Sequence, residues 1–163
     1  GEEARWQSIN HTKISSYGIE ASATTNLQQL LPSQQTLKTL SVSYSYIHQD
    51  KGMERNIVSQ YALEYLKHKL VASLDLHIWS KLNSTLHFRW QDRVGTYTDF
   101  QNQVNDYRPF ALVDARLCWK EDRKYMFYAE ANNLLNNKNY VDYGNVPQPG
   151  AWIVVGACWQ LDF

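Results

Sequence analysis

Along most of this chain, apolar residues alternate with polar or small ones, and this alternation constrains the fold more than any other feature. The last run shows it most clearly, because Ile153, Val155, Ala157 and Trp159 are separated by single residues that are mostly small or polar. A period of two is that of a β-strand, whose successive side chains point to opposite faces of a sheet. The alternation predicts eight strands, over residues 3–10, 12–26, 36–49, 64–79, 82–94, 109–120, 124–133 and 151–163.

The connections between these predicted strands alternate between short and long. Short turns lie at residues 80–81 and 121–123, whereas long polar loops cover about residues 95–108 and 134–150. Short turns on one side of the membrane and long loops on the other are typical of outer-membrane barrels. The segment 27–35 is longer than this pattern predicts for the short-turn side.

The predicted strands are long enough for a membrane and carry aromatic residues near their ends. Most runs approach ten residues, the length that a tilted strand needs to cross a bilayer, whereas strands of soluble proteins usually have five or six. Tyrosine and tryptophan near strand ends suit the headgroup level of a membrane. The tryptophans near predicted strand ends are Trp79, Trp90, Trp119, Trp152 and Trp159.

The polar faces of the predicted strands carry charged residues. Charges are costly in the dry core between two packed sheets, but they suit a wet lumen. We therefore predict an all-β fold, an antiparallel transmembrane β-barrel, and keep a soluble β-sandwich binding module as an alternative. The charged residues expected in the lumen are Asp75, Arg89, Arg93, Asp114, Arg116 and Glu130.

Composition agrees with a barrel and excludes other classes. Sixteen Lys and Arg balance sixteen Asp and Glu, so the whole chain offers no basic surface for nucleic acid. The mean hydropathy of −0.53 fits a barrel, because only alternate residues face lipid. No run of about 18 apolar residues occurs, so the sequence predicts no transmembrane helix.

The last part of the chain, residues 125–163, resembles the C-terminal signature of TonB-dependent outer-membrane receptors. Ala151 departs from the family, which often has Arg between the preceding glycine and the aromatic residue. Two upstream segments resemble recurrent strands of the same family, so the resemblance covers nearly the whole chain. The matching elements are YGIE (17–20), LKHKL (66–70), EANNLL (130–135), NNKNY (136–140), PQPG (147–150) and the terminal Phe163.

The resemblance implies a 22-stranded barrel with an N-terminal plug in a bacterial outer membrane. Residues 1–163 would be the C-terminal portion, about eight strands, with the plug and earlier strands absent from this chain. Such a receptor is not an enzyme and has no cofactor; it imports a large scarce nutrient, namely a ferric siderophore, haem or cobalamin. The loop DYGNVPQPG (142–150) looks most like receptors of the Bacteroidetes type, among which cobalamin receptors occur.

The implied partners are outer-membrane lipid, the rest of the receptor barrel and its plug, and the nutrient. The TonB complex would act through the plug, and the barrel-assembly machinery would recognise Phe163 as the terminal aromatic. A complete eight-stranded barrel with a structural or adhesive role stays open, because 163 residues and eight strands also fit one.

Aromatic residues on the predicted long loops are the best candidates for ligand contact. Exposed loop aromatics are common binding anchors, but the same side chains can simply pack the loops together. The sequence leaves both interpretations open. The candidates are Tyr97, Phe100, Tyr107, Tyr140 and Tyr143.

The sequence favours structural roles for its thiols and histidines. Cys118 and Cys158 are expected on strands separated by one other, about 10 Å apart, which is too far for a disulfide. The histidines lack the spacing of metal ligands, and we expect them to be hydrogen-bonded in the lumen. They are His11, His48, His68, His77 and His87.

Two chemical alternatives find weaker support. Paired catalytic groups could be sought among the lumen charges, but a wet barrel interior holds such charges anyway. Calcium could be held by loop oxygens, although their spacing is not that of an EF-hand. Those oxygens belong to Asp99, Asn102, Asn105 and Asp106.

Overall fold

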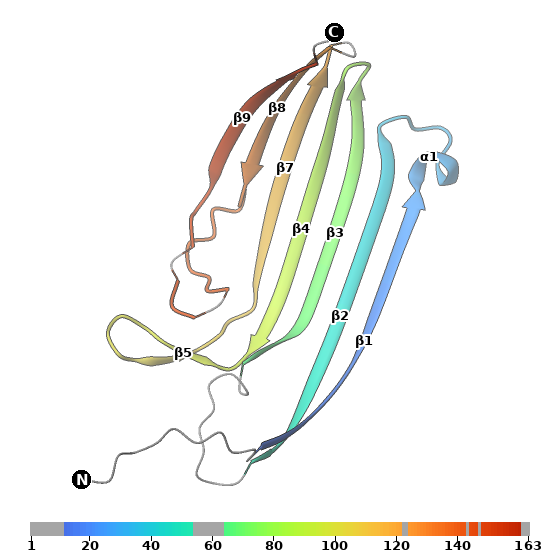
Figure 1. Cartoon of the computed structure of the whole chain (residues 1–163). Coiled ribbons are helices and arrows are strands. Elements are labelled where there is room, and N and C mark those ends of the chain that lie inside the picture. The colour runs from blue at the N-terminus through green and yellow to red at the C-terminus, as the bar shows by residue number, and fades with distance from the viewer. Residues whose placement is uncertain (1–11, 54–63, 122–123, 143, 147, 161–163) are drawn as a thin grey trace, which may run out of the picture.

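The described residues form one large antiparallel sheet, shown in Figure 1. The computed structural model describes residues 12–53, 64–121, 124–142, 144–146 and 148–160. The seven strands of the large sheet lie in the order β1-β2-β3-β4-β7-β8-β9, and β5 pairs with β6 in a second sheet. The elements are β1 (Thr12–Asn26), α1 (Leu27–Leu30), β2 (Leu37–Met53), β3 (Tyr65–Trp79), β4 (Leu82–Val94), β5 (Thr96–Thr98), β6 (Val104–Asp106), β7 (Phe110–Lys120), β8 (Tyr125–Asn132) and β9 (Trp152–Trp159).

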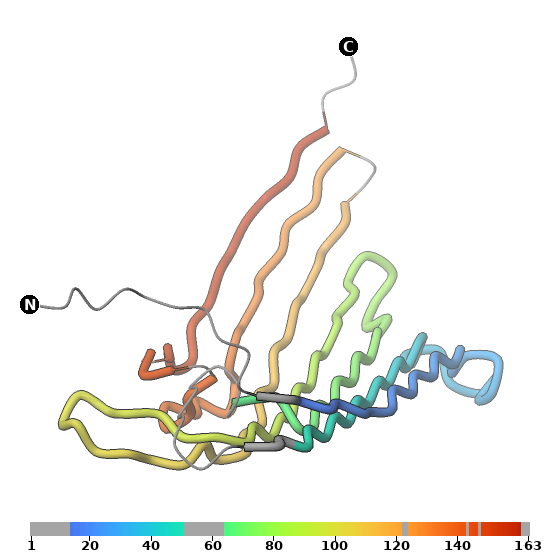
Figure 2. Tube along the Cα trace, turned by 60° about the horizontal axis from the view of Figure 1, so that its bottom comes forward, coloured from blue at the N-terminus to red at the C-terminus, as the bar shows by residue number. Residues whose placement is uncertain are grey.

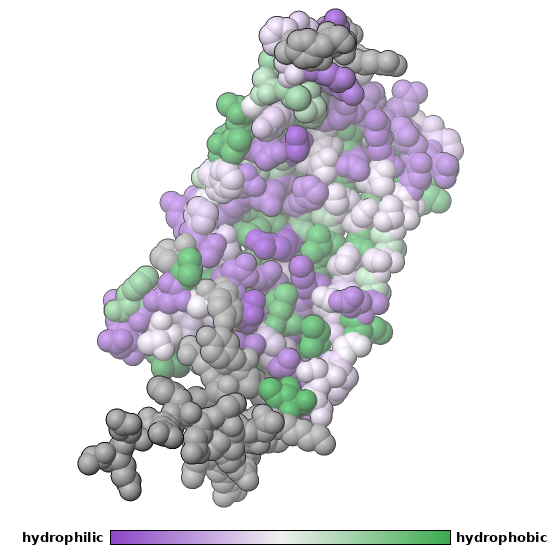
Figure 3. Space-filling view, in the orientation of Figure 1, coloured by the Kyte–Doolittle hydropathy of each residue, from purple (hydrophilic) through white to green (hydrophobic). Residues whose placement is uncertain are grey.

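The strand register sorts the side chains into an apolar face and a polar face. In β4, Leu86 lies opposite Leu74 of β3 and Ala115 of β7. The adjacent residue Thr85 lies opposite Asp75 of β3 and Arg116 of β7, and these three side chains belong to the other face. The face turned to the viewer in Figure 3 is mainly hydrophilic. The two faces therefore follow the alternation of the sequence.

Many hydrophobic side chains of the apolar face are exposed. Ile19 is 64%, Ile153 72% and Val155 75% exposed, although β1 and β9 lie at opposite edges of the sheet. A contiguous exposed apolar surface of this kind is rare on soluble monomers and marks contact with lipid or a partner.

The height of the apolar face matches the apolar band of a membrane barrel. On β4 this face begins at Leu82 and meets its first charged residue at Asp92, ten residues further along. At about 3.3 Å per residue the distance along the strand is about 33 Å. A strand tilt of about 40° reduces this to a height of about 25 Å, the value typical of outer-membrane barrels.

The connections gather by length at the two ends of the sheet. The short-turn end holds residues 80–81 between β3 and β4, the end of β7 and the start of β8, and α1 (Figure 1). The long-loop end holds the β5–β6 hairpin and residues 133–151, which connect β8 to β9. The predicted lengths are confirmed for the two short turns and the two long loops, whereas most of the connection between β2 and β3 lies outside the described residues.

The helix α1 was not predicted, and it occupies the connection that looked too long. The Asn26 side chain accepts hydrogen bonds from the backbone N–H groups of Gln28 (3.0 Å) and Gln29 (3.3 Å), a standard N-cap arrangement. Four residues are too few to show a period of 3.6, so the apolar pattern could not reveal this helix. No helix in the described part of the chain is long and apolar enough to span a membrane.

Seven of the eight predicted strands are confirmed. The remaining one, the first along the chain (residues 3–10), lies outside the described residues. A β-sandwich requires two large facing sheets, whereas these residues form one large sheet and a two-stranded one. Figure 2 shows the large sheet bent but open, with β1 and β9 as its edges. A closed eight-stranded barrel is therefore not formed by the described strands.

Three side chains lie on the face opposite to the one expected. His68 lies opposite Tyr46 on the apolar face, where His68 Nδ1 is 2.7 Å from the Tyr44 hydroxyl. His48 shares this face, so the prediction of lumen histidines is wrong for both. Side chains of β2 and β3 keep alternating between the two faces up to the long-loop end. His48 and His68 therefore fall in the same rows as the apolar residues, although they lie beyond the hydrophobic part of these strands. Trp152 pairs with Asn132 on the polar face and is not part of a lipid-facing girdle.

Candidate functional site

The loop between β4 and β7 contains the β5–β6 hairpin, where the sequence had predicted only a long polar loop. Its turn is held by Asp99, whose Oδ1 accepts hydrogen bonds from the backbone N–H groups of Gln101 and Gln103, each at 2.9 Å. Asp99 Oδ2 accepts a hydrogen bond from Asn105 Nδ2 at 2.9 Å. These hydrogen bonds, above all the one from Gln103, lower the pKa of the Asp99 carboxyl.

The geometry of this turn gives a structural role to the residues considered for calcium. Both carboxylate oxygens of Asp99 already accept hydrogen bonds within the hairpin. Asn102 adopts a left-handed conformation with φ of 60°, as turn asparagines often do. The described residues hold no cluster of three or more His, Cys, Asp or Glu side chains that could bind a metal ion.

The loop from residue 133 to 151 is organised by Asn133, which is 3% exposed and has a left-handed φ of 52°. Its backbone N–H donates to Asp114 Oδ1 on β7 at 2.7 Å. Its side-chain Nδ2 donates to the carbonyls of Asn137 (2.8 Å) and Pro149 (3.1 Å), and its Oδ1 accepts from the Asn137 N–H at 3.0 Å. One asparagine therefore joins both ends of the loop to the sheet.

A second asparagine of the sequence motif fixes the approach to β9. The Ala151 N–H donates to Asn136 Oδ1 at 3.0 Å. A Cβ at Gly150 would stand 2.6 Å from that oxygen and 2.8 Å from Lys138 Cε, so a larger residue requires a shift. These contacts explain physically why asparagines and a Pro-Gly loop occur together here.

The loop then folds back onto the polar face of the sheet. The Tyr140 ring packs on the Phe110 ring of β7, with ring centroids 4.5 Å apart. Burial raises the pKa of the Tyr140 hydroxyl. Two residues further along, Asp142 accepts a hydrogen bond from Gln91 Nε2 of β4 and lies 3.8 Å from Arg89 Nη1. The buried hydrophobic cluster at this point is Phe110, Leu112 and Tyr140.

Tyr107 joins three connections at the long-loop end. Its buried hydroxyl donates to Glu64 Oε2 at 3.0 Å and accepts the N–H of Gly144 at 2.8 Å. The Arg93 guanidinium lies 5.7 Å from the centre of the Tyr107 ring, and the Tyr97 ring centroid lies 5.2 Å away. Burial raises the pKa of Tyr107, so this hydroxyl is neutral at ordinary pH.

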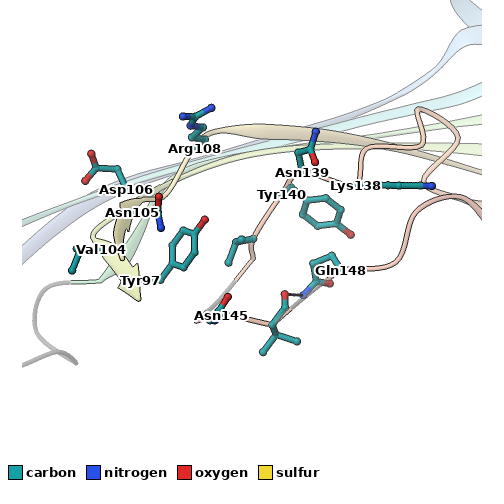
Figure 4. A pocket seen from close by; sticks show the side chains of 12 residues that line it. Tyr97, Val104, Asn105, Asp106, Arg108, Lys138, Asn139, Tyr140, Asn145 and Gln148 are labelled. Atoms are coloured by element: carbon teal, nitrogen blue, oxygen red, sulfur yellow. Dashed lines mark hydrogen bonds between the residues drawn. The ribbon is translucent and has the colours of Figure 1, made fainter. Parts of the chain in front are cut away.

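A pocket of about 530 Å³ lies between the hairpin and the last loop. Figure 4 shows the Tyr97 and Tyr140 side chains facing this space from opposite sides, while Arg108 and Asp106 extend away from it. Four amide side chains supply hydrogen-bond donors and acceptors. The lining residues are Tyr97, Val104, Asn105, Asp106, Arg108, Lys138, Asn139, Tyr140, Val141, Asn145, Val146 and Gln148.

The pocket is built for binding rather than for catalysis. Aromatic rings and amides provide stacking surfaces and hydrogen bonds, the usual means of holding a polar ligand. Its charged groups lie at the rim, as Figure 4 shows for Arg108 and Lys138. The pocket lies between two loops, and the last loop is fixed by contacts with the polar face of the sheet.

The structure brings together two of the predicted ligand-contact residues, Tyr97 and Tyr140, in the pocket lining. Tyr107 stands behind Tyr97 and packs the loops. Phe100 is 78% exposed at the tip of the hairpin, away from the pocket lining. Tyr143 and the terminal Phe163 lie outside the described residues.

Sequence reasoning missed three amides of the pocket, namely Asn139, Asn145 and Gln148, and it considered the fourth, Asn105, only as a calcium ligand. The abundance of Asn and Gln in both loops was a visible signal. Its meaning depended on the contact between the two loops, which follows from β4, β7, β8 and β9 being neighbours in the sheet.

The charged residues expected in the lumen do lie on the polar face, where they contact one another and neighbouring strands. Arg116 Nη1 is 3.1 Å from Glu130 Oε1, and its guanidinium lies 4.8 Å from the centre of the Tyr128 ring. Thr85 donates to Asp75 Oδ1 at 2.9 Å. The first set of contacts joins β7 to β8, and the second joins β4 to β3.

The two cysteines are free thiols on the polar face of β7 and β9, with β8 between them. Cys118 lies opposite Tyr128, and Cys158 lies opposite Met126. Two of the histidines share this face: His77 Nδ1 is 2.9 Å from Asn83 Oδ1, and His87 lies opposite Asp114.

Comparison with known proteins gives one family. The family described as TonB dependent receptor-like, beta-barrel matches residues 1–134. This match covers the upstream strands, whereas most of the terminal motif at 125–163 lies beyond it. No curated protein matches the chain, and no solved structure matches it.

The match covers well over half of the chain and agrees with the open, strand-rich sheet. Proteins of this family are outer-membrane receptors and transporters, not enzymes. From its strands, its two-faced sheet and this match, the chain belongs to the family of TonB-dependent receptor β-barrels.

Proposed function

We propose that this chain forms the C-terminal strands of a TonB-dependent receptor that imports a large scarce nutrient across a bacterial outer membrane. Residues 1–163 would supply the last part of the barrel wall. The plug and the earlier strands would complete the receptor, and the TonB complex would act through the plug. Within the described residues β1 and β9 are the edge strands of the sheet. Neighbouring strands of a larger barrel would pair with the free backbone N–H and C=O groups of these edges. The barrel-assembly machinery would recognise the terminal Phe163.

The pocket between the hairpin and the last loop is the observation that carries the binding part of this proposal. It lies at the long-loop end, and in outer-membrane barrels the longer loops face the cell exterior. It also borders the polar face, which would line the lumen. A nutrient arriving from outside would therefore meet this pocket on its way into the barrel.

The chemistry of the pocket supports a ligand rich in polar groups, with cobalamin as the first candidate and a ferric siderophore or haem as the others. Cobalamin carries many amide groups. The side chains of Asn139, Asn145 and Gln148 can donate to and accept from such groups, whereas Asn105, whose Nδ2 donates within the hairpin, can accept through its Oδ1. A pocket of about 530 Å³ holds only part of so large a ligand, so the plug and other loops would contribute the remaining contacts. The loop sequence, which looks like that of Bacteroidetes receptors, supports the same candidate.

Equilibrium binding to the purified full-length receptor in detergent tests this proposal, with cyanocobalamin, haemin and a ferric siderophore as probes. Tyr97→Ala should weaken the binding of the recognised probe by about tenfold, because the substitution removes an aromatic contact surface. Phe100→Ala is the matched control, since Phe100 is on the same hairpin but outside the pocket lining. Its affinity should equal that of the unmodified receptor.

Two results would contradict the proposal. One is that none of the three probes binds the folded receptor. The other is that Phe100→Ala weakens binding as much as Tyr97→Ala, which would move the contact to the hairpin tip and away from the pocket.

A further inference from the structure

We propose that a groove on the apolar face, at the short-turn end of the sheet, binds one phospholipid with a zwitterionic, amine-bearing headgroup. The groove lies at the turn between β3 and β4 and has a volume of about 420 Å³. That turn is near the top of Figure 1. This site lies at the opposite end of the strands from the nutrient pocket and on the opposite face of the sheet. Its lining residues are Trp79, Ser80, Lys81, Leu82 and Trp119.

The groove exists because a medium-sized side chain lies between two large ones in the same row of the sheet. Leu82 of β4 lies opposite Trp79 of β3 and Trp119 of β7. The two indoles stand as walls, with Trp79 76% and Trp119 52% exposed. In the next row of this face, Ser84 lies opposite Leu117 and is buried, so Leu82 is the innermost residue of β4 that lines the groove.

An acyl chain is the occupant that this groove fits. The groove opens on the apolar face, and beyond Leu82 the same face of β4 continues to Leu86, about 13 Å further along the strand, so an acyl chain that leaves the groove meets apolar surface. The indoles of Trp79 and Trp119 would flank the start of the chain near the headgroup level, where tryptophan is favoured in membranes. The side chains of Trp79, Leu82 and Trp119 that line the groove are apolar, so they can make dispersion contacts with the methylene groups of an acyl chain.

The charged pair at the end of the groove indicates the kind of headgroup. The Lys81 ammonium forms an ion pair with the Glu121 carboxylate, which joins the two neighbouring turns. A backbone hydrogen bond from the Lys120 N–H to the Lys81 carbonyl, at 2.9 Å, joins the same turns. The two side chains are about half exposed, so both can also face a headgroup.

A zwitterionic headgroup matches this pair group by group. Its phosphate can approach the Lys81 ammonium while its amine donates to the Glu121 carboxylate. An anionic headgroup that lacks the amine would instead place its negative charge beside Glu121. The contacts are half exposed, so the expected preference is modest, about two- to fivefold.

Tryptophan quenching by brominated lipid in the reconstituted full-length receptor tests the proposal. The vesicles are phosphatidylcholine with a minor share of acyl-brominated phosphatidylethanolamine or acyl-brominated phosphatidylglycerol. Subtracting the emission of Trp79→Phe or Trp159→Phe isolates each tryptophan, and Trp159 serves as an exposed tryptophan of the same face outside the groove. Phosphatidylethanolamine should quench Trp79 about two- to fivefold more than Trp159, and phosphatidylglycerol should quench both alike.

Equal quenching of the two tryptophans by both lipids would overturn the proposal, because it would show random contact with bulk lipid. A preference for phosphatidylglycerol would overturn the assignment of the headgroup. The double substitution Lys81→Gln with Glu121→Gln should abolish the preference for phosphatidylethanolamine. The barrel should still fold, which is checked by the different gel mobility of the unheated and the boiled protein. A preference that survives this double substitution would also refute the role of the pair.

Discussion

Replacing Tyr107 with phenylalanine tests whether the last loop is fixed to its neighbours through one hydroxyl group. The substitution keeps the ring and removes the group that donates to Glu64 at 3.0 Å and accepts from the Gly144 N–H at 2.8 Å. A hydrogen bond of this kind contributes about 1 kcal/mol net. Losing it at Gly144 should raise the local opening equilibrium about fivefold, since 1.4 kcal/mol corresponds to tenfold.

Amide hydrogen exchange of the folded receptor measures this effect directly. The Gly144 amide should lose about fivefold of its protection, while amides in the middle of β7 should keep theirs. Tyr97→Phe is the matched control, because the Tyr97 hydroxyl makes no hydrogen bond within the described residues while its ring lies 5.2 Å from that of Tyr107. Unchanged protection at Gly144 in Tyr107→Phe, or an equal loss in Tyr97→Phe, would refute the reasoning.

Three further predictions concern the same loops. Asn133→Ala should destabilise the last loop by about 3 kcal/mol, because it strains a left-handed residue and removes the side-chain hydrogen bonds, and limited proteolysis of the folded receptor should cut the loop faster. Gly150→Ala should also increase cleavage, because the new Cβ would clash with Asn136 Oδ1. In the control Gly144→Ala the new Cβ meets no atom within 4 Å, so the loop should lose only about 1 kcal/mol of stability through left-handed backbone strain. Burial raises the pKa values of Tyr107 and Tyr140 above the ordinary 10.0. Both hydroxyls are therefore neutral below pH 10, where their contacts are complete, and these contacts are lost as the pH rises through the raised pKa values. Amide protection in the loop should therefore be constant at neutral pH and fall above pH 10, and a fall near pH 7 would contradict this.

The two faces of the sheet could be predicted because strand alternation is a local property of the sequence. Rows such as Leu74, Leu86 and Ala115 follow from the parity of each strand once neighbouring strands pair. Short turns predicted the antiparallel pairing of β3 with β4 and of β7 with β8, because a short turn places consecutive strands side by side.

The site was only partly predictable, because its contacts join segments that are distant in sequence. Tyr97 and Tyr140 could be proposed as exposed loop aromatics, but nothing local indicated that they would line one pocket. Asp142 reaches Gln91 across 51 positions of the sequence, and Tyr107 reaches Gly144 across 37. Such pairs depend on how the loop folds onto the sheet, which the alternation of the strands does not encode.

The most direct test of the whole account compares two adjacent valines on β9 by spin labelling of the full-length receptor in vesicles. Val154 and Val155 have the same side chain, yet Val154 lies opposite Glu130 on the polar face and Val155 lies opposite Ala129 on the apolar face. With Cys118 and Cys158 replaced by serine, a label at Val155→Cys should be accessible to membrane-dissolved oxygen and shielded from a water-soluble nickel chelate. The label at Val154→Cys should show the reverse preference or shielding from both reagents. Free access of the nickel chelate to the label at Val155→Cys would show that the apolar face is in water, and it would contradict the assignment of this chain to a receptor barrel wall.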